Sequence, residues 1–556
     1  MAPNFTLQAQ LVDVWQKKIY PASISVREGR IESIRDISAT FSDPVALLPY
    51  ILPGFIDSHV HIESSMLVPS EFARLAVVHG TVATVSDPHE IANVCGMAGV
   101  EYMISNGRTV PFKFYFGAPS CVPATPFETA GATLDAQAVA ALLQKDEVKY
   151  LSELMNFPGV LNDDPEVRQK IAAARQYNKP VDGHAPGLRG ADASHYIQGG
   201  PAFAGNGVVI STDHECFTAE EALDKLQHGM KIIIREGSAA KNFEALIGLL
   251  PAHADSILFC SDDKHPDSLK FGHINELCKR AIEKGFDLFQ VLQAACINPV
   301  LHYNLEVGLL RVGDPADFIL VNDLRSFTVL QTYIDGQLVA HKGETMIPSV
   351  EAPLINHFNA SPRRLPDFAV PWQGEKEIPV IEALDGQLIT NKVMLPPAVA
   401  DNLIVSDPSR DLLKIVVVNR YADAPVAKAF VRNFGLQSGA LASSVAHDSH
   451  NIVAVGVDDE SICRAVNAII EQKGGVCCIH EEGDLVLPLP VAGLMSNADG
   501  FEIALRYTII DMAAKTLGTP LSAPFMTLSF MALLVIPHLK LSDKGLFDGD
   551  QFAFIG

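Results

Sequence analysis

Two histidines one residue apart follow an apolar run in the segment GFIDSHVHIESSM, residues 54–66. In a β-strand, residues i and i+2 point to the same side, so His59 and His61 would direct both imidazoles to one point. Val60 would face the other way. Two imidazoles aimed at one point can bind a metal ion. Because HxH motifs also occur in ordinary turns, the rest of the chain must decide between these interpretations.

Metal-capable and acidic side chains recur at the ends of further β-rich segments. They are Asp87 with His89, Glu153, His184, His214 with Glu215, and Asp262 with Asp263. Each one alone would be an ordinary turn residue, core imidazole or solvated strand end. In a TIM-type barrel, however, the carboxyl ends of the strands meet at one mouth, where active sites lie. The pattern therefore predicts a metal site at such a mouth.

The elements that would position these side chains are eight β-rich segments that alternate with helical patterns. The segments are 55–62, 81–88, 113–119, 150–156, 180–186, 208–215, 231–237 and 256–263. Between them, stretches such as 70–80, 166–178 and 219–229 space apolar residues three and four apart, as amphipathic helices do. The alternation predicts an α/β fold, a TIM-type (β/α)8 barrel over residues 51–305, with the third unit the least regular.

Two short β-rich pieces, 11–36 and 313–343, flank the barrel region. Each alternates apolar and polar residues and turns at an acidic residue followed by glycine, Glu28–Gly29 and Asp335–Gly336. We expect them to form one small β-sandwich domain that the barrel interrupts.

The remaining chain mixes strand patterns, such as 412–420 and 451–459, with helical ones such as 460–475. This mixture predicts an α+β domain at the C-terminal end. The predicted domains are residues 1–50 together with 306–350, the barrel at 51–305, a proline-rich and charged linker at 351–380, and the α+β domain at 381–556.

Composition excludes several classes of protein. The chain has 556 residues, 48% of them apolar, and a formal net charge of −23, without a basic run that could bind nucleic acid. Its most apolar stretch, 528–539, is too short to span a bilayer and contains Pro537, and no signal-peptide pattern begins the chain. Nine cysteines without a CxxC pair indicate buried thiols in a reducing compartment. We expect a globular cytoplasmic protein with neither nucleic-acid nor membrane partners.

The order of the motifs resembles a known family. HxH on the first barrel strand, an acid on the fourth, histidines on the fifth and sixth and an aspartate on the eighth is the pattern of the amidohydrolase superfamily. Longer segments are similar to bacterial-type adenine deaminases: PGFIDSHVHIESSM, SDPHEIANVCG, DGHAPGLRGADASHYI, STDHE, IIREGSAAKN and FCSDDKHPDSL. The likeness continues through 444–456 and 528–549, so it covers essentially the whole chain.

The resemblance implies a centre of two divalent metal ions. His59, His61 and Asp262 would hold one ion, His184 and His214 the second, and Glu153 would bridge both. Many relatives use a carboxylated lysine on the fourth strand, whereas this chain offers Glu153, which favours the deaminase branch over dihydroorotase-like or hydantoinase-like hydrolases. The family points to manganese or iron, with zinc as a substitute, and two close ions can lower the pKa of a shared water.

The implied reaction is the hydrolytic deamination of adenine to hypoxanthine and ammonia by a metal-bridged hydroxide that attacks C6. Asp262 would accept the hydroxide proton and deliver it to the leaving amine. Alternatively, Asp262 is only a ligand, and Asp263 or Glu215 moves the protons. Protonation of the ring at N1 requires another acid, for which Glu63, Glu90 and Glu215 are candidates.

Other polar residues are candidates for substrate contact. His89, at the end of the second strand, either contacts substrate and transfers protons or stabilises a turn. The candidates for gripping the purine are Glu63, Asp263, Arg189, Arg235 and Ser238, several of which lie in loops as polar as ordinary solvated ones. His447, Asp448 and His450 form either a separate metal site or, as we favour, a turn or a contact onto the barrel mouth.

Three rival functions are weighed against this prediction. Zinc-dependent cytidine and nucleic-acid deaminases need HxE and a later PCxxC; the segment 61–63 supplies the first, but the chain contains no PCxxC. A related enzyme could act on another aminopurine or a cyclic amide. A non-catalytic relative should have lost ligands, and all six positions are filled. The C-terminal domain either covers the mouth or builds the interface of the homodimer that the resemblance suggests.

Overall fold

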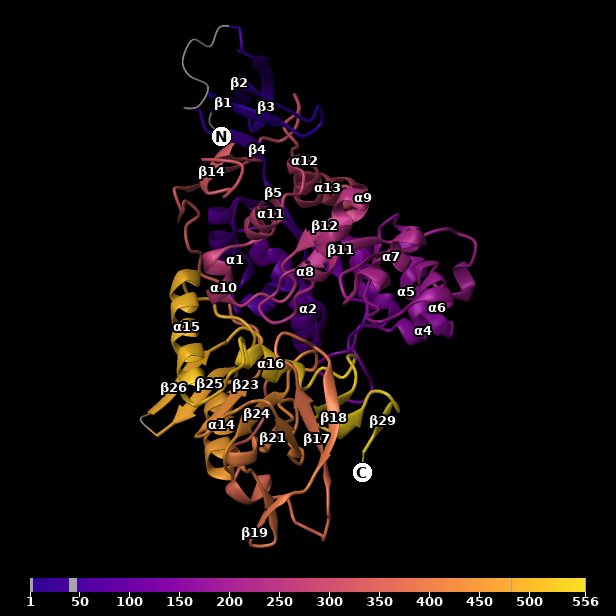
Figure 1. Ribbon diagram of the computed structural model, residues 1–556, viewed down its shortest axis with the longest axis vertical. Helices are drawn as coiled ribbons and strands as arrows, with labels where there is room; N and C mark the ends of the chain where they lie inside the picture. Colours follow the sequence, from indigo (N-terminus) through magenta and orange to yellow (C-terminus); the bar gives the residue numbers. More distant parts are fainter. Residues whose placement is uncertain (1–3, 40–47, 482, 556) are drawn as a thin grey trace.

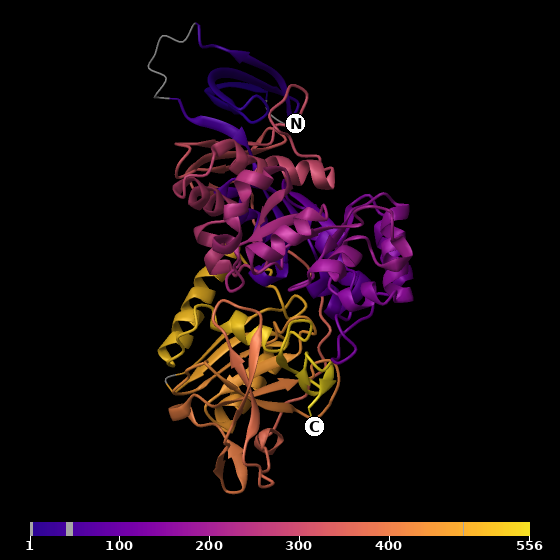
Figure 2. The same cartoon turned by 45° about the vertical axis from the view of Figure 1, so that its right-hand side comes forward.

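The computed structural model describes residues 4–39, 48–481 and 483–555. Three eight-stranded sheets follow one another along the longest axis of the molecule (Figure 1). The sheet with β1 (Phe5–Asp13) lies at one end, the sheet with β5 (Phe55–Val60) in the middle and the sheet with β21 (Leu413–Val418) at the other end. The turned view shows the same order, with the C-terminal part against one end of the middle region (Figure 2).

The middle sheet consists of eight parallel strands in chain order. Its strands are β5, β6 (Thr81–Ser86), β7 (Lys113–Ala118), β8 (Val148–Leu154), β9 (Val181–Gly183), β10 (Ile210–Asp213), β11 (Lys231–Arg235) and β12 (Ile257–Cys260). Each overlaps one of the eight predicted segments, and even the irregular third unit forms a strand. Nearly every residue of these strands is buried, as expected for a parallel sheet covered on both faces.

The first and last strands of this order also meet. The backbone N–H of Asp262 donates to the carbonyl of His59 at 3.0 Å, and the N–H of His61 donates to the carbonyl of Asp262 at 3.4 Å. An isolated parallel bridge pairs Val60 with Asp262. The ends of β5 and β12 therefore lie side by side.

Helices connect the strands of the middle sheet and follow its last strand. They are α1 (Pro69–Ala76), α2 (His89–Gly107), α3 (Ala136–Leu143), α4 (Phe157–Leu161), α5 (Pro165–Gln176), α6 (Gly190–Ile197), α7 (Ala219–Gln227), α8 (Phe243–Leu246), α9 (Leu250–His253), α10 (Pro266–Phe271), α11 (Ile274–Glu283), α12 (Leu288–Leu292) and α13 (Asn298–Tyr303). The three helices predicted at 70–80, 166–178 and 219–229 correspond to α1, α5 and α7. At α5, the Asp164 carboxylate accepts the N–H groups of Glu166 and Val167, and Pro165 begins the helix.

The segments on either side of the middle region share one sheet. Its order is β16 (Glu344–Thr345), β15 (Gln337–His341), β14 (Val329–Ile334), β13 (Phe318–Val321), β4 (Tyr50–Pro53), β1, β2 (Lys18–Arg27) and β3 (Arg30–Asp36). β4 joins the two pieces because it pairs with β1 in parallel and with β13 in antiparallel orientation. Both predicted turns close hairpins: Glu28 and Gly29 have φ of 50° and 78°, and Asp335 and Gly336 have 47° and 72°.

The C-terminal part contains a third sheet with helices against it. Its order is β18 (Thr390–Leu395), β17 (Ile378–Ala383), β22 (Ala427–Arg432), β21, β24 (Ile452–Gly456), β23 (Ala440–Ser443), β25 (Gly475–His480) and β26 (Gly483–Pro488). The further elements are β19 (Ala398–Ala400) with β20 (Leu403–Val405), β27 (Leu539–Ser542) with β28 (Gly545–Asp548) and β29 (Ala553–Phe554), α14 (Asp459–Gln472), α15 (Gly500–Thr516) and α16 (Pro524–Phe530). The predicted strands at 412–420 and 451–459 are β21 and β24, and the predicted helix at 460–475 is α14.

Residues 351–380, predicted as a linker, contain a short 3-10 helix at Leu365–Phe368 and the start of β17. Phe368 is fully buried against the C-terminal core. All nine cysteines lie within the described residues and are free, and seven of them are buried. In the described part of the chain, no helix combines the length and apolarity needed to cross a membrane.

Candidate metal centre

The HxH motif has the geometry expected of a strand end. His59 lies in β5, and His61 follows it directly. Their Nε2 atoms are 3.1 Å apart, so both imidazoles face one point. His61 Nδ1 lies 3.2 Å from the carbonyl of Asp87, which can only accept a hydrogen bond. His61 therefore carries its proton on Nδ1 and presents the lone pair of Nε2 to the centre.

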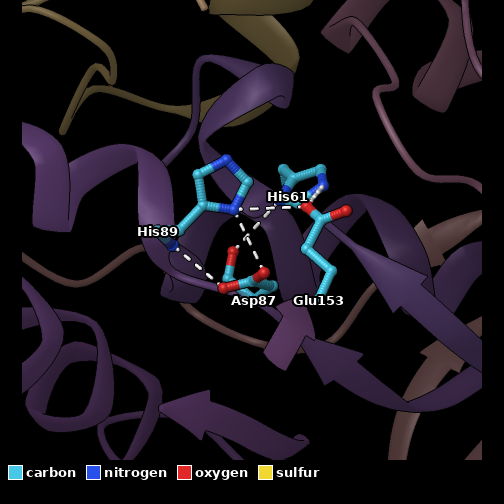
Figure 3. Close-up of side chains that lie close together, drawn as sticks. All are labelled: His61, Asp87, His89 and Glu153. Atoms are coloured by element: carbon cyan, nitrogen blue, oxygen red, sulfur yellow. Dashed lines mark hydrogen bonds and ion pairs between the residues drawn. The ribbon is translucent and has the colours of Figure 1, made fainter. Parts of the chain in front are cut away.

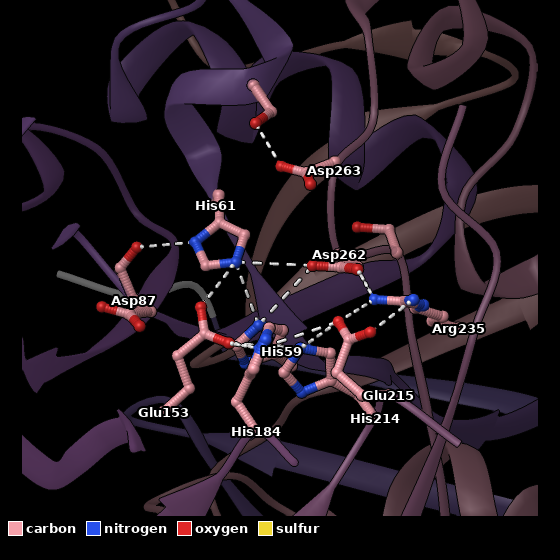
Figure 4. A network of polar contacts seen from close by, with 12 residues as sticks. His59, His61, Asp87, Glu153, His184, His214, Glu215, Arg235, Asp262 and Asp263 are labelled. Carbon is pink, nitrogen blue, oxygen red and sulfur yellow. Dashed lines mark hydrogen bonds and ion pairs between the residues drawn. The ribbon is translucent and has the colours of Figure 1, made fainter. Parts of the chain in front are cut away.

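Glu153, on β8, lies among four imidazoles (Figure 4). Its Oε1 is 3.2 Å from His61 Nε2 and 3.3 Å from His89 Nδ1. Its Oε2 is 2.7 Å from His184 Nδ1 and 3.3 Å from His214 Nε2. Each carboxylate oxygen thus faces a different pair of histidines, which is the arrangement that a bridging ligand requires.

Asp262 lies opposite Glu153, just after β12. Its Oδ1 is 3.4 Å from His61 Nε2 and 3.6 Å from His59 Nε2, and its Oδ2 accepts a hydrogen bond from Arg235 Nη1 at 2.8 Å. Asp262 has a φ of 53°, in the left-handed region that few residues other than glycine adopt. This backbone conformation coincides with the bridge to β5 and with the orientation of the carboxylate toward both histidines.

These side chains fit a divalent metal ion. Ligand atoms lie within 4.8 Å of one another in several buried groups: His59 with His214 and Asp262; Glu153 with His184 and His214; His61 with Asp262 and Asp263; His61 with Asp87, His89 and Glu153. His59 Nδ1 and His184 Nε2 are buried ring nitrogens without a hydrogen-bond partner. Imidazole with carboxylate is a ligand set that first-row divalent metals accept.

The electrostatics of the centre also suit a cation. Although burial opposes ionisation, His184 holds the pKa of Glu153 well below its ordinary value. Burial also opposes the protonation of His61, but Asp262 and Glu153 outweigh it and raise the pKa of His61. Buried carboxylates that hold protons on neighbouring imidazoles would hold a metal ion instead once those protons leave.

Arg235 lines the cavity at this centre, but its hydrogen bonds go to protein carboxylates. Its Nη2 donates to Glu215 Oε2 at 2.9 Å, and its Nη1 contacts both Glu215 Oε1 and Asp262. Despite burial, this guanidinium lowers the pKa of Glu215 to about 2. Arg235 was predicted to contact substrate, and the structure shows it orienting two acids.

His89 faces Asp87 and Glu153 with its Nδ1 (Figure 3). Its Nδ1 is 3.0 Å from Asp87 Oδ2, and its Nε2 is 3.5 Å from both Glu90 Oε1 and Asp448 Oδ1. That nitrogen has no hydrogen-bond partner, although it is buried at the cavity wall. The sequence marked Asp87 as an acid at a strand end. It did not indicate that Asp87 orients the ring of His89.

The predicted substrate residues fall into different places. Asp263 lines the cavity and accepts a hydrogen bond from the Ser64 hydroxyl. Glu63, Arg189 and Ser238 are not among its lining residues in the described chain. Glu63 is buried beside it and accepts the N–H of Ile91 at 3.2 Å, and burial raises its pKa to about 7.

The other two residues outside the lining lie in loops. Ser238 accepts the N–H of His265 at 2.9 Å and contacts the Ser268 hydroxyl at 3.1 Å. Arg189 is exposed just before α6. Polar composition alone could not place these two side chains, because a polar loop is equally consistent with solvent.

The C-terminal part supplies a share of the cavity that the sequence did not assign. The residues it contributes are Leu388, His447, Asp448, Leu533 and Val535. His447 Nε2 is 3.1 Å from Glu90 Oε1, and His450 Nε2 contacts Glu90 Oε2. The motif at 447–450 thus contacts the mouth of the barrel, which is the role that we favoured from the sequence. The sequence assigned no role to the three aliphatic residues.

Comparison with known proteins agrees with this geometry. Residues 50–339 match the amidohydrolase family, and residues 387–553 match the adenine deaminase C-terminal domain. The adenine deaminase of Sulfurovum sp. is 56% identical over 550 residues, covering 99% of this chain and 99% of that protein. The adenine deaminase of Salinibacter ruber is 55% identical, covering 100% and 99%, and that of Methanosarcina barkeri is 51% identical, covering 99% and 98%.

The matched ranges contain both sides of the cavity. Every barrel residue of the centre lies within 50–339, and the cavity residues of the C-terminal part lie within 387–553. Matches of this length, with the resemblance of the motifs, leave one assignment. The chain belongs to the amidohydrolase family, among its adenine deaminases.

Proposed function

We propose that this protein hydrolyses adenine to hypoxanthine and ammonia. The observation that carries the proposal is the position of Glu153, which faces four imidazoles where the parallel strands end, in a chain of the adenine deaminase family. The reaction would serve purine salvage, in the cytoplasm and in a homodimer, as in the family that the motifs resemble.

The proposed cofactor is a pair of divalent ions, manganese or iron, with zinc as a substitute. His59, His61, Glu153, His184, His214 and Asp262 would hold them. When bound, such ions lower the pKa of water and so supply a nucleophile at neutral pH. The buried donor groups and the unpartnered Nε2 of His184, which lines the cavity, support this assignment.

Asp262 is the residue we assign to proton transfer. One carboxylate oxygen faces the centre, and the other is held by Arg235 at 2.8 Å. Although burial opposes it, this guanidinium keeps the pKa of Asp262 well below its ordinary value, so the carboxylate is ionised. Glu215 is paired with Arg235 through both oxygens, which favours a positioning role for it.

His89 is the residue we assign to protonation of the purine ring. Asp87 and Glu90 outweigh burial and raise the pKa of His89 well above its ordinary value. Its unpartnered Nε2 at the cavity wall can then donate to the purine ring and make it more electrophilic. Glu63 does not line the cavity, and Glu90 is held by His447 and His450.

The finer architecture belongs to the same proposal. The middle sheet closes as a TIM-type barrel, which the bridge between Val60 and Asp262 supports. The domains are residues 1–50 with 306–350 as a small β-sandwich, 51–305 as the barrel, 351–380 as a linker and 381–556 as an α+β domain. Residues 1–3, 40–47, 482 and 556 within these ranges lie outside the described residues. The sheet shared by β4 and β13 supports the first of these domains.

The test is release of hypoxanthine and ammonia from adenine by the purified protein. The protein is reconstituted with manganese, and chelator-treated protein and adenosine serve as parallel samples. We expect metal-dependent turnover of adenine and little turnover of adenosine. Absence of adenine turnover by metal-loaded protein would overturn the substrate assignment and direct the assay to other aminopurines and cyclic amides.

A further inference from the structure

The wall of the cavity that faces the metal centre is built by the C-terminal part. Leu388 precedes β18, His447 and Asp448 follow β23, and Leu533 and Val535 follow α16. Figure 1 shows α16 lying where the C-terminal part meets the middle region. The proposed metal ligands all come from the middle region, so this opposite wall must have another role.

Two segments of this wall are tied together beneath the cavity. The buried Lys540 donates to the carbonyl of Leu388 at 2.6 Å and to the carbonyl of Phe530 at 2.8 Å. Thr390 adds a bond from its hydroxyl to the carbonyl of Leu539 at 2.8 Å. The aliphatic side chains of the wall are therefore held in fixed positions and can pack on a flat aromatic ring.

Asp448 is the polar group of this wall that still needs a donor. It is 3% exposed, and its Oδ2 has no hydrogen-bond partner. Its Oδ1 is 3.5 Å from His89 Nε2, too far for a good hydrogen bond. A buried carboxylate oxygen without a donor is costly, so its retention points to a donor that arrives with a ligand.

Glu90, the neighbouring acid, also has a buried oxygen without a hydrogen-bond partner, Oε1. That oxygen lies 3.1 Å from His447 Nε2 in an ion pair, and Oε2 contacts His450. Glu90 and Asp263 outweigh burial and raise the pKa of His447 to about 9, so a charged imidazole compensates Glu90. Of the two unpartnered oxygens, Asp448 Oδ2 is therefore the one that no ion pair of the described residues reaches.

The lining of the cavity favours an aromatic N–H over a metal cation as the partner of Asp448. His89 and Glu90 lie close enough to Asp448 to share a cation with it, but Glu90 is already paired with His447 and His450. Leu388, Leu533 and Val535 line the same cavity and offer no ligand atoms. One imidazole, that of His89, separates Asp448 from Glu153. A planar heterocycle can lie between Glu153 and Asp448, with one end at the metal centre and an N–H at Asp448.

We propose that Asp448 accepts the imidazole N–H of the purine and thereby selects the free base over its N9-substituted derivatives. This inference rests on the proposed adenine deamination and adds the residue that reads the far edge of the substrate. Ribose at N9 removes the donor in the N9–H tautomer and directs a bulky group at the wall formed by Leu533 and Val535.

The test compares the wild type with Asp448→Asn, and with Asp423→Asn as a matched control at an exposed site. Each protein is loaded with manganese, its metal content is measured, and KM and kcat are determined for adenine. We expect Asp448→Asn to raise KM about ten- to a hundredfold, to change kcat less than about threefold, and to leave metal content unchanged. Asp423→Asn should match the wild type.

A second measurement changes the ligand, and its deciding comparison needs only the wild type. An adenine analogue with sulfur in place of N9–H leaves the five-membered ring without any N–H. We expect it to inhibit about ten- to a hundredfold more weakly than adenine binds, and Asp448→Asn should not weaken it further. Equal binding of the analogue and adenine would overturn the proposal even if the variant does not fold.

The remaining outcomes separate this inference from others. A fall in kcat at constant KM would overturn it by assigning Asp448 to proton transfer through His89. Loss of one metal equivalent in Asp448→Asn would overturn it in favour of a cation held by His89, Glu90 and Asp448. Wild-type turnover of adenine with an unaffected variant would reject the role of Asp448 and leave the proposed function intact.

Discussion

The two walls of the central cavity differ in the chemistry that they offer. The barrel wall consists almost entirely of histidines and acids at strand ends, with paired atoms 2.7–3.7 Å apart. The C-terminal wall consists of aliphatic side chains with His447 and Asp448. Under the proposed function, the difference assigns metal binding and proton transfer to one wall, and binding of the substrate ring and exclusion of water to the other. Changes on the first should lower kcat, and changes on the second should raise KM.

The strongest way to test this division is Glu153→Gln on the barrel wall. Glutamine keeps the shape but removes the charge that both carboxylate oxygens share among four imidazoles. We expect kcat/KM for adenine to fall by about a thousandfold or more, together with the metal content. Metal analysis and the hypoxanthine assay check this. Normal metal content with normal turnover would remove Glu153 from the centre.

The second test, Arg235→Gln, acts on the barrel wall without removing a proposed ligand. The variant leaves Glu215 and Asp262 buried without their cation, so we expect kcat to fall about ten- to a hundredfold. Because this guanidinium lowers the pKa of both acids, the acidic fall in the pH–rate profile should move to higher pH.

A matched control for that variant is Arg280→Gln. Arg280 also pairs with two glutamates, Glu236 and Glu244, outside the cavity lining. It should leave the pH–rate profile unchanged. If Arg235→Gln raised KM at constant kcat, Arg235 would contact the substrate instead, as its place in a polar loop first suggested.

The C-terminal wall is tested by Leu533→Ala. Loss of this side chain removes about 2 kcal/mol of apolar contact, so we expect KM for adenine to rise about thirtyfold with kcat and metal content nearly unchanged. Leu505→Ala, at a residue 52% exposed on α15, serves as the control. A loss of metal in Leu533→Ala would show that the two walls do not act separately.

The two walls also differ in what the sequence could predict. Residues such as His59 and His61 were predictable because the period of a strand sets their direction and the strand ends of parallel units converge. Leu533 and Val535 were not, because aliphatic residues are common in any core and their place depends on how distant segments pack. Arg235 was predicted by type and position, but only the folded chain shows which acids it pairs with.

A smaller effect is expected at Lys540, which supports the C-terminal wall from below. Burial lowers its pKa from 10.5 to about 7, so between these values the folded protein binds fewer protons than the unfolded chain. The contribution of Lys540 to the free energy of unfolding should therefore rise with pH, by at most about 1.4 kcal/mol per pH unit. Below pH 7 the destabilisation that follows from this pKa shift is fully present.

Thermal unfolding of Lys540→Met and wild type at pH 7.5 and 9.5 measures this slope. The wild type should gain stability relative to the variant at the higher pH. Lys544→Met is the matched control, because the Lys544 ammonium also donates to two carbonyls but is exposed. Parallel pH dependence in wild type and Lys540→Met would contradict the buried, neutral form of Lys540 in the fold.

The smallest effect is expected at Arg189, which belongs to neither wall. Its sequence context suggested a grip on the purine, yet it is exposed before α6 and does not line the cavity. Because a surface substitution changes free energies by only about 0.5 kcal/mol, Arg189→Ala should keep kcat and KM within about twofold of wild type. A tenfold rise in KM would mean that the loop before α6 closes over bound adenine, which would add a third, mobile wall to the comparison.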